Sequence, residues 1–62
     1  MMDSVFYGFR VLQVLDDWKD ALQVSRETGL PYNDVKAVLE GLVRRGLAFK
    51  DGRFYIRKEG RA

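Results

Sequence analysis

The sequence predicts a mainly α-helical fold of three helices, followed by a small two-stranded β-hairpin. Apolar residues recur at three- and four-residue spacings up to about residue 45, as on the buried faces of helices. Gly29 and Pro31 interrupt this pattern and predict a tight turn between two helices. After Gly46 the spacing changes to alternation around Asp51-Gly52, which is a strong hairpin signal.

Size and composition restrict the kinds of protein that this chain can be. Its 62 residues fit a single domain, 1–62. A chain this short buries only about 60% of the surface that its unfolded form exposes, so its core alone is marginal. Cys and His are absent, which excludes disulfides, thiolate or imidazole metal sites and the common nucleophile–base pairs. No membrane span or signal peptide is apparent, and we expect a cytoplasmic protein without metal or cofactor.

The charges are distributed unevenly along the chain. Residues 1–43 carry four basic and seven acidic side chains, a net charge of −3. Residues 44–62 carry seven basic and two acidic side chains, a net charge of +5. This asymmetry indicates a polyanionic partner for the C-terminal part. The alternative is a solvated surface with a charged tail.

The first helix is predicted over residues 4–17, with Asp3 or Ser4 as N-cap. One apolar stripe on it holds Val5, Phe9, Leu12 and Leu15, and a second holds Tyr7, Val11, Val14 and Trp18. A helix that is apolar over so wide an arc is buried on more than one side. We therefore expect the second stripe to form a homodimer interface, or else to be covered by the hairpin and tail.

Two further helices are predicted on either side of the turn. The second spans 21–28, between Asp20 as N-cap and Gly29, which can adopt the left-handed conformation that ends helices. The third spans 31–45, because Pro31 suits a first helical turn. Its buried face is expected to hold Val35, Val38, Leu39, Leu42 and Val43.

The hairpin is expected over residues 47–57, followed by a tail of residues 58–62. With Asp51-Gly52 as a two-residue turn, Lys50 lies opposite Arg53. The inner face is then expected to hold Leu47, Phe49, Phe54 and Ile56. The outer face is expected to hold Ala48, Lys50, Arg53, Tyr55 and Arg57.

The cations beside this turn predict contacts with phosphate. Like charges directly opposite one another destabilise a hairpin, so Lys50 facing Arg53 indicates an anion between them. Tyr55 and Arg57 on the same face, and Arg26 on the second helix, are further candidates for phosphate contacts. Alternatively, the hairpin groups are solvated and protect an exposed edge strand from aggregation, and Arg26 pairs with Glu27 or another acid on the surface.

The exposed face of the third helix carries candidates for contacts with DNA bases. The amide of Asn33 suits adenine, Lys36 suits guanine or a phosphate, and Tyr32 suits a thymine methyl group. Asp34 and Glu40 on the same helix repel phosphate. No arrangement of acid, base and nucleophile is present and no glycine-rich loop follows a strand, so we do not expect an enzyme.

The segment ALQVSRETGLP, which begins at Ala21, continues through Val35, Leu39, Leu42, Gly46-Leu47 and the segment DGRFY that ends at Tyr55. This pattern, over about residues 20–57, resembles the winged helix-turn-helix superfamily. It looks most like the DNA-binding domains of IclR-, MarR- and ArsR-type regulators. The resemblance implies that the third helix enters the major groove with Tyr32, Asn33 and Lys36. It also implies that the hairpin, or wing, places Lys50, Arg53 and Arg57 on a flanking phosphate strand or in the minor groove.

IclR-type regulators add an effector domain, whereas we expect a stand-alone domain here, and no small-molecule effector site is apparent. We expect a homodimeric, sequence-preferring transcriptional regulator of prokaryotic, archaeal or viral type that binds double-stranded DNA. One alternative is a winged-helix adaptor that docks on a larger protein assembly without contacting DNA. Another is a replication or partition accessory factor.

Overall fold

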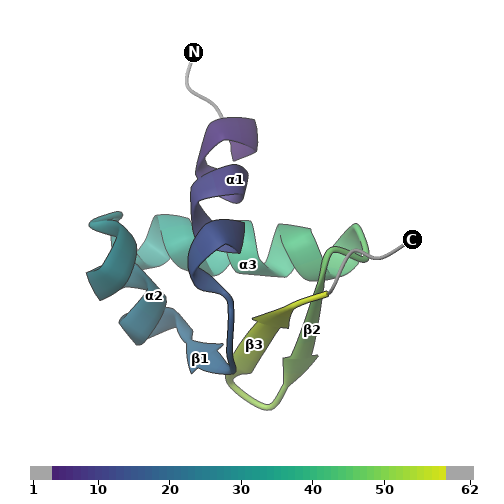
Figure 1. Ribbon diagram of the computed structural model, residues 1–62. Helices are drawn as coiled ribbons and strands as arrows, with labels where there is room; N and C mark the ends of the chain where they lie inside the picture. The colour runs from purple at the N-terminus through teal and green to yellow at the C-terminus, as the bar shows by residue number, and fades with distance from the viewer. Residues whose placement is uncertain (1–3, 59–62) are drawn as a thin grey trace.

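The computed structural model describes residues 4–58, with side chains from Tyr7 onward. This range forms the helices α1 (Ser4–Val14), α2 (Ala21–Thr28) and α3 (Tyr32–Arg44) and the strands β1 (Lys19–Asp20), β2 (Ala48–Asp51) and β3 (Phe54–Arg57) (Figure 1). The strands form an antiparallel sheet in the order β1-β3-β2. The predicted mainly α-helical fold with a hairpin is confirmed, and its layout is compatible with a winged helix-turn-helix.

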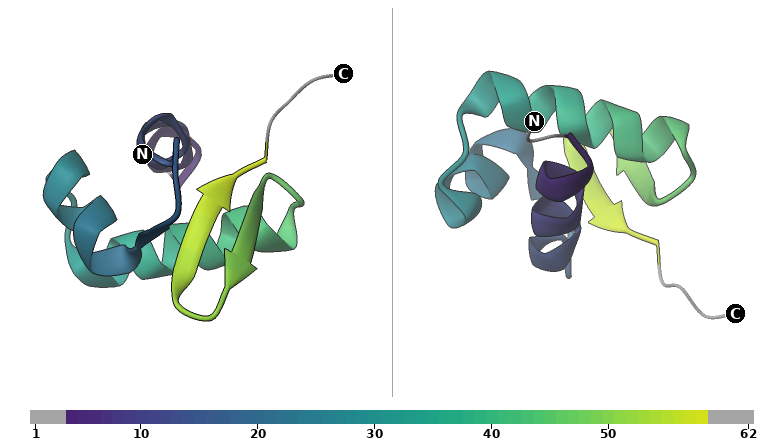
Figure 2. Two further views of the ribbon diagram at one scale, coloured as in Figure 1. Left: turned by 60° about the horizontal axis from the view of Figure 1, so that its bottom comes forward. Right: turned by 90° about the horizontal axis from the view of Figure 1, so that it is seen from above.

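The three helices surround one core, and the sheet closes its remaining side. α1 crosses α3, α2 lies beside the start of α3, and the hairpin lies along its later turns (Figure 2). The core residues are Val11, Leu15, Ala21, Val24, Leu30, Val35, Leu39, Leu42, Ala48 and Tyr55. Of the helices that residues 4–58 form, none has the length and apolar character needed to cross a bilayer.

The boundaries of α2 follow from local sequence, as predicted. The Asp20 carboxylate accepts a hydrogen bond from the backbone N–H of Gln23 at 2.9 Å, which is the expected N-cap contact. Gly29 has φ 77° and donates its N–H to the Ser25 carbonyl, so it ends the helix in the left-handed conformation. Leu30 then packs into the core between α2 and α3.

α3 begins at Tyr32, after Pro31 as N-cap, and ends at Arg44. Its predicted buried face is confirmed, because Val35, Leu39 and Leu42 are buried and Val38 and Val43 pack beside them. At its end, Leu47 N–H donates to the Leu42 carbonyl and Gly46 N–H to the Val43 carbonyl. With Gly46 at φ 79°, these two bonds form a Schellman motif, which directs the chain into β2.

The hairpin register differs from the predicted one. Lys50 lies opposite Tyr55 and Asp51 opposite Phe54, so the turn residues are Gly52 and Arg53. Gly52 has φ 63° and no described residue other than glycine has positive φ, which is the sign pattern of a type II′ turn. The prediction that Lys50 faces Arg53 is therefore wrong.

The sheet also turns the opposite face toward the core. Ala48 and Tyr55 are buried, whereas Phe49 is 52% exposed and Leu47 and Phe54 are also exposed. The predicted inner and outer faces are thus exchanged. The reason is the Schellman motif after α3, which sets the direction of entry into β2 so that Ala48, the small residue, packs against the helix.

Both apolar stripes of α1 contribute to the core. Val11 of the second stripe and Leu15 of the first are 0% exposed, and Tyr7, Leu12 and Val14 pack beside them. The prediction that this stripe forms a dimer interface is wrong for Val11, which has no accessible surface. Trp18 lies beyond the helix. Phe9, from the stripe that was predicted to be buried, is 62% exposed. The Val5 side chain and the proposed cap Asp3 lie outside the described residues, as do residues 59–62 of the tail.

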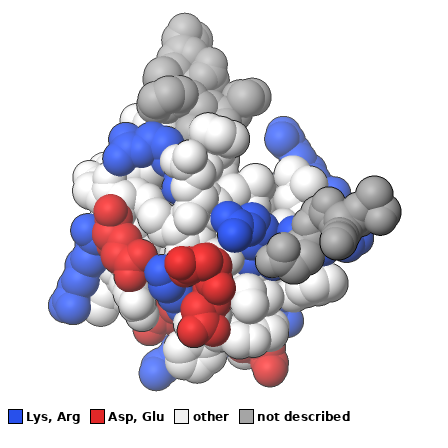
Figure 3. All heavy atoms as spheres, in the orientation of Figure 1, with Lys and Arg blue, Asp and Glu red and all other residues white. Residues whose placement is uncertain are grey.

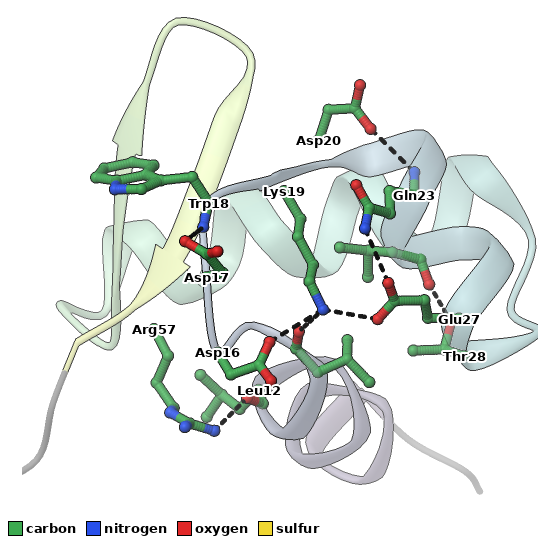
Figure 4. A network of polar contacts seen from close by, with 12 residues as sticks. Leu12, Asp16, Asp17, Trp18, Lys19, Asp20, Gln23, Glu27, Thr28 and Arg57 are labelled. Carbon is green, nitrogen blue, oxygen red and sulfur yellow. Dashed lines mark hydrogen bonds and ion pairs between the residues drawn. The ribbon is translucent and has the colours of Figure 1, made fainter.

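α1 ends at Val14, before the predicted end at residue 17, and two cations satisfy carbonyls of its last turn. Lys19 Nζ donates to the Val14 carbonyl at 2.7 Å, and Arg57 Nη1 donates to the Leu12 carbonyl at 2.8 Å (Figure 4). Positive charge at a helix C-terminus is favourable. The segment that follows contains β1, which adds a third strand beside β3.

Candidate nucleic-acid interface

The start of α3, the start of α2 and the tip of the hairpin enclose one surface hollow of about 300 Å³. Four of the residues that were predicted to contact DNA line it: Tyr32 and Lys36 from α3, and Lys50 and Arg53 from the hairpin. Asp20, Ala21, Leu22, Gly52 and Tyr55 complete the lining. The structure therefore brings two of the three predicted base-contacting residues together with both predicted cations of the wing tip.

The predicted base-contacting residues all lie on the exposed side of α3. Tyr32, Asn33 and Lys36 are exposed, because the buried face of the helix is formed by Val35, Leu39 and their neighbours. Tyr32 and Lys36 stand one turn apart and share the hollow, whereas Asn33 does not line it. An exposed helix face of this kind is what a major groove admits.

Arg53 occupies the outermost position of the hairpin. It is the second residue of the turn, and its guanidinium lies 5.2 Å from the centre of the Phe54 ring. No ion pair or hydrogen bond to another described residue engages it. Arg53 is therefore the wing cation best placed to contact a phosphate.

Lys50 is already paired within the chain. Its Nζ donates to Glu40 Oε2 at 3.0 Å and lies 5.6 Å from the centre of the Tyr55 ring. The hydrogen bond to Glu40 raises the pKa of the Lys50 ammonium group. Hydrogen bonds from Tyr55 and then from Lys50 lower the pKa of the Glu40 carboxyl group. Lys50 thus remains charged, but its charge is largely balanced by Glu40.

The predicted phosphate contact of Tyr55 is wrong, and that of Arg57 stays a prediction for a side chain that is already engaged within the chain. Tyr55 is 1% exposed and donates its hydroxyl to Glu40 Oε2 at 2.7 Å, so the ring fills the core and the hydroxyl is engaged. Arg57 points back to α1, where its side chain caps the Leu12 carbonyl and its backbone N–H donates to the Leu15 carbonyl. Both follow from the exchange of the sheet faces.

Arg26 is exposed on α2 and has no ion-pair or hydrogen-bond partner among residues 4–58. It does not line the hollow between α3 and the wing. Its predicted phosphate contact stays a prediction. Only a nucleic acid that extends past the hollow toward α2 would reach it.

Acidic side chains gather elsewhere, around the connection from α1 to β1 (Figure 3). Lys19 lies among them and contacts Asp16 at 3.0 Å and Glu27 at 2.7 Å (Figure 4). The hydrogen bond to Lys19 is the main cause that lowers the pKa of both carboxyl groups, and Glu27 in turn raises the pKa of Lys19. This cluster joins α1, β1 and α2 and is unsuited to a polyanion.

A second surface feature is a groove of about 380 Å³ between α1 and the end of α3. Its lining is mostly apolar, with Gly8, Leu12, Ala37, Val38, Gly41, Leu42 and Leu47, and it is bordered by Arg44 and Arg45. A Cβ atom at Gly41 would meet nothing within 4 Å, so this glycine keeps the groove open. Sequence reasoning missed the groove because it depends on how two distant helices cross.

Neither a scan against models of known protein families nor searches of curated proteins and of solved structures find a match to this chain.

Proposed function

We propose that this protein is a transcriptional regulator that binds double-stranded DNA, with α3 in the major groove and the hairpin tip on the adjacent backbone. One observation carries the proposal: Tyr32, Lys36 and Arg53 surround the same hollow, although they come from separate parts of the chain. Phosphate contacts from the wing would fix the position of the helix, and contacts from α3 would read the bases.

The test is the salt dependence of binding to a short duplex of mixed sequence. Neutralising one phosphate changes the slope of log K against log salt by about 0.9, so Arg53→Ala is expected to flatten the slope by about that amount. Arg44→Ala, which removes an equal charge outside the hollow, is the control and should change the slope less. Equal effects of the two variants would show general attraction to DNA without a defined interface.

Sequence preference is tested separately by selection from random duplexes. Asn33→Ala is expected to alter the enriched sequences, because an amide that reads a base carries information that a phosphate contact lacks. An equal loss of binding on every sequence would contradict the role of Asn33 in base reading.

We further propose that the regulator is a homodimer, whose contact uses the exposed side of α1 and not the predicted stripe. Phe9 is exposed on α1, the helix whose residues Gly8 and Leu12 line the apolar groove. A two-fold symmetric contact needs matching surfaces on the same chain, and α1 offers both an exposed aromatic ring and one wall of an apolar groove. Such a dimer would present two α3 helices to an inverted repeat.

A protein-interaction adaptor is the second candidate function. The outer face of the sheet favours it, because Trp18, Phe49 and Phe54 are all exposed there, and exposed apolar patches mark interaction sites. Failure of the wild-type protein to retain any duplex at low salt would favour the adaptor over the regulator.

A further inference from the structure

Among the described residues of α3, only Glu40 has a carboxylate that accepts hydrogen bonds from the hairpin. A single oxygen, Oε2, accepts hydrogen bonds from Lys50 Nζ at 3.0 Å and from the Tyr55 hydroxyl at 2.7 Å. Neither donor is close to Glu40 in sequence. The carboxylate therefore connects the recognition helix to both strands of the wing.

The position of this charge matters for any polyanion that approaches the hollow. Lys36 stands one helical turn before Glu40, and its charge also lowers the pKa of that carboxyl group. Glu40 thus interacts with two cations, Lys36 and Lys50, that line the hollow. Its side chain is 38% exposed, so a phosphate group near Lys50 would also be repelled by the carboxylate.

We propose that Glu40 is a positioning residue that holds the wing against α3 and, through Lys50, limits the affinity of the interface for DNA. The inference rests on the proposed DNA-binding function and deepens it. In the free protein the carboxylate balances the Lys50 charge, so binding gains less from Lys50 than from an unpaired lysine. Because the electrostatic attraction to all sequences is then weaker, base contacts supply a larger share of the binding free energy.

The decisive variant is Glu40→Gln. The glutamine amide oxygen can still accept hydrogen bonds from Tyr55 and Lys50, so the hairpin should remain docked while the negative charge is lost. The slope of log K against log salt on a mixed-sequence duplex should become steeper by up to about 0.9. If affinity at about 1 M salt is unchanged, binding at about 0.1 M salt should tighten by up to about eightfold.

Two matched variants separate charge from structure. Tyr55→Phe removes the other hydrogen bond to Glu40 Oε2 but keeps the carboxylate, so its slope should match that of the wild type. Glu27→Gln removes a carboxylate that pairs with Lys19 at 2.7 Å, away from the hollow, and should also leave the slope unchanged. A Tyr55→Phe slope as steep as that of Glu40→Gln would show that loosening of the wing is the cause, and would overturn the proposal.

Coupling to Lys50 is tested in a Lys50→Met background, where Glu40→Gln should steepen the slope by clearly less than it does in the wild type. An equal change in both backgrounds would overturn the action through Lys50. An unchanged or weaker Glu40→Gln affinity, with a normal thermal unfolding midpoint, would overturn the inference alone. Absence of any binding by the wild-type protein at low salt would instead overturn the DNA-binding function itself.

Discussion

At the scale of single residues, Tyr55 determines which side of the wing can contact a ligand. Alternation in the sequence groups it correctly with Ala48, Lys50 and Arg57 but does not say which of the two faces is buried. The more apolar face was expected inside, yet the structure buries the tyrosine. A buried tyrosine needs a partner for its hydroxyl, and that partner, Glu40, precedes it by 15 residues. No local pattern reveals such a pair.

Tyr55→Phe is expected to lower the free energy of unfolding by about 1 kcal/mol, because it removes one hydrogen bond to a carboxylate and leaves the ring in place. Urea unfolding followed by circular dichroism measures the change. Tyr32→Phe serves as control, since Tyr32 is exposed and should tolerate the loss of its hydroxyl. Equal stability of Tyr55→Phe and wild type would contradict a stabilising role for this bond.

At the scale of secondary-structure elements, the sequence predicted the features that depend on residues close together in the chain. The start and end of α2 follow from Asp20 and Gly29, and the buried face of α3 follows from its spacing of apolar residues. The hairpin turn was placed one residue early, because Asp51-Gly52 and Gly52-Arg53 both suit a two-residue turn. Strand β1 has two residues and exists only by pairing with β3, so no periodicity could predict it.

Asp20→Ala is expected to destabilise the protein by about 1 kcal/mol, since it leaves the Gln23 N–H without its capping oxygen. Asp20→Asn retains a capping oxygen and should be nearly neutral. Thermal unfolding of the two variants measures the difference. Equal destabilisation by both would assign the effect to the charge of Asp20 and not to the cap.

At the scale of the whole molecule, ion pairs connect separate elements of the fold. Lys19 links α1 to α2, and Glu40 links α3 to the hairpin. The acidic partners Asp16, Glu27 and Glu40 all have lowered pKa values. The unfolded chain therefore binds more protons than the folded one in moderate acid, and stability must decrease there.

The melting temperature should accordingly be constant above the ordinary carboxyl pKa of 4.5 and should fall as the pH decreases through the lowered values. Calorimetry between about pH 6 and about pH 3 measures this fall. Glu27→Gln should make the fall shallower, because it removes one of the three titrating groups. A melting temperature that does not change over this range would refute the contribution of these pairs.

The proposed dimer also belongs to this scale. Phe9→Asp should give monomers in sedimentation at micromolar concentration, because a charge cannot enter the apolar groove of a second copy. The fold should be retained, since Phe9 is exposed. Leu22→Asp, which charges an exposed leucine on α2, is the control and should remain dimeric. A wild-type protein that sediments as a monomer would remove the basis for this contact.

The position of Trp18 gives the protein a built-in optical probe. It is the sole tryptophan of the sequence, is 45% exposed, and its indole points away from the Lys19 side chain (Figure 4). Its fluorescence therefore reports on the outer face of the sheet and not on the hollow beside α3. A ligand that seats on the sheet will shift the emission to shorter wavelength, whereas a duplex held by α3 and Arg53 will leave the wavelength nearly unchanged. The emission wavelength of the unlabelled protein thus distinguishes binding on the sheet from binding at α3.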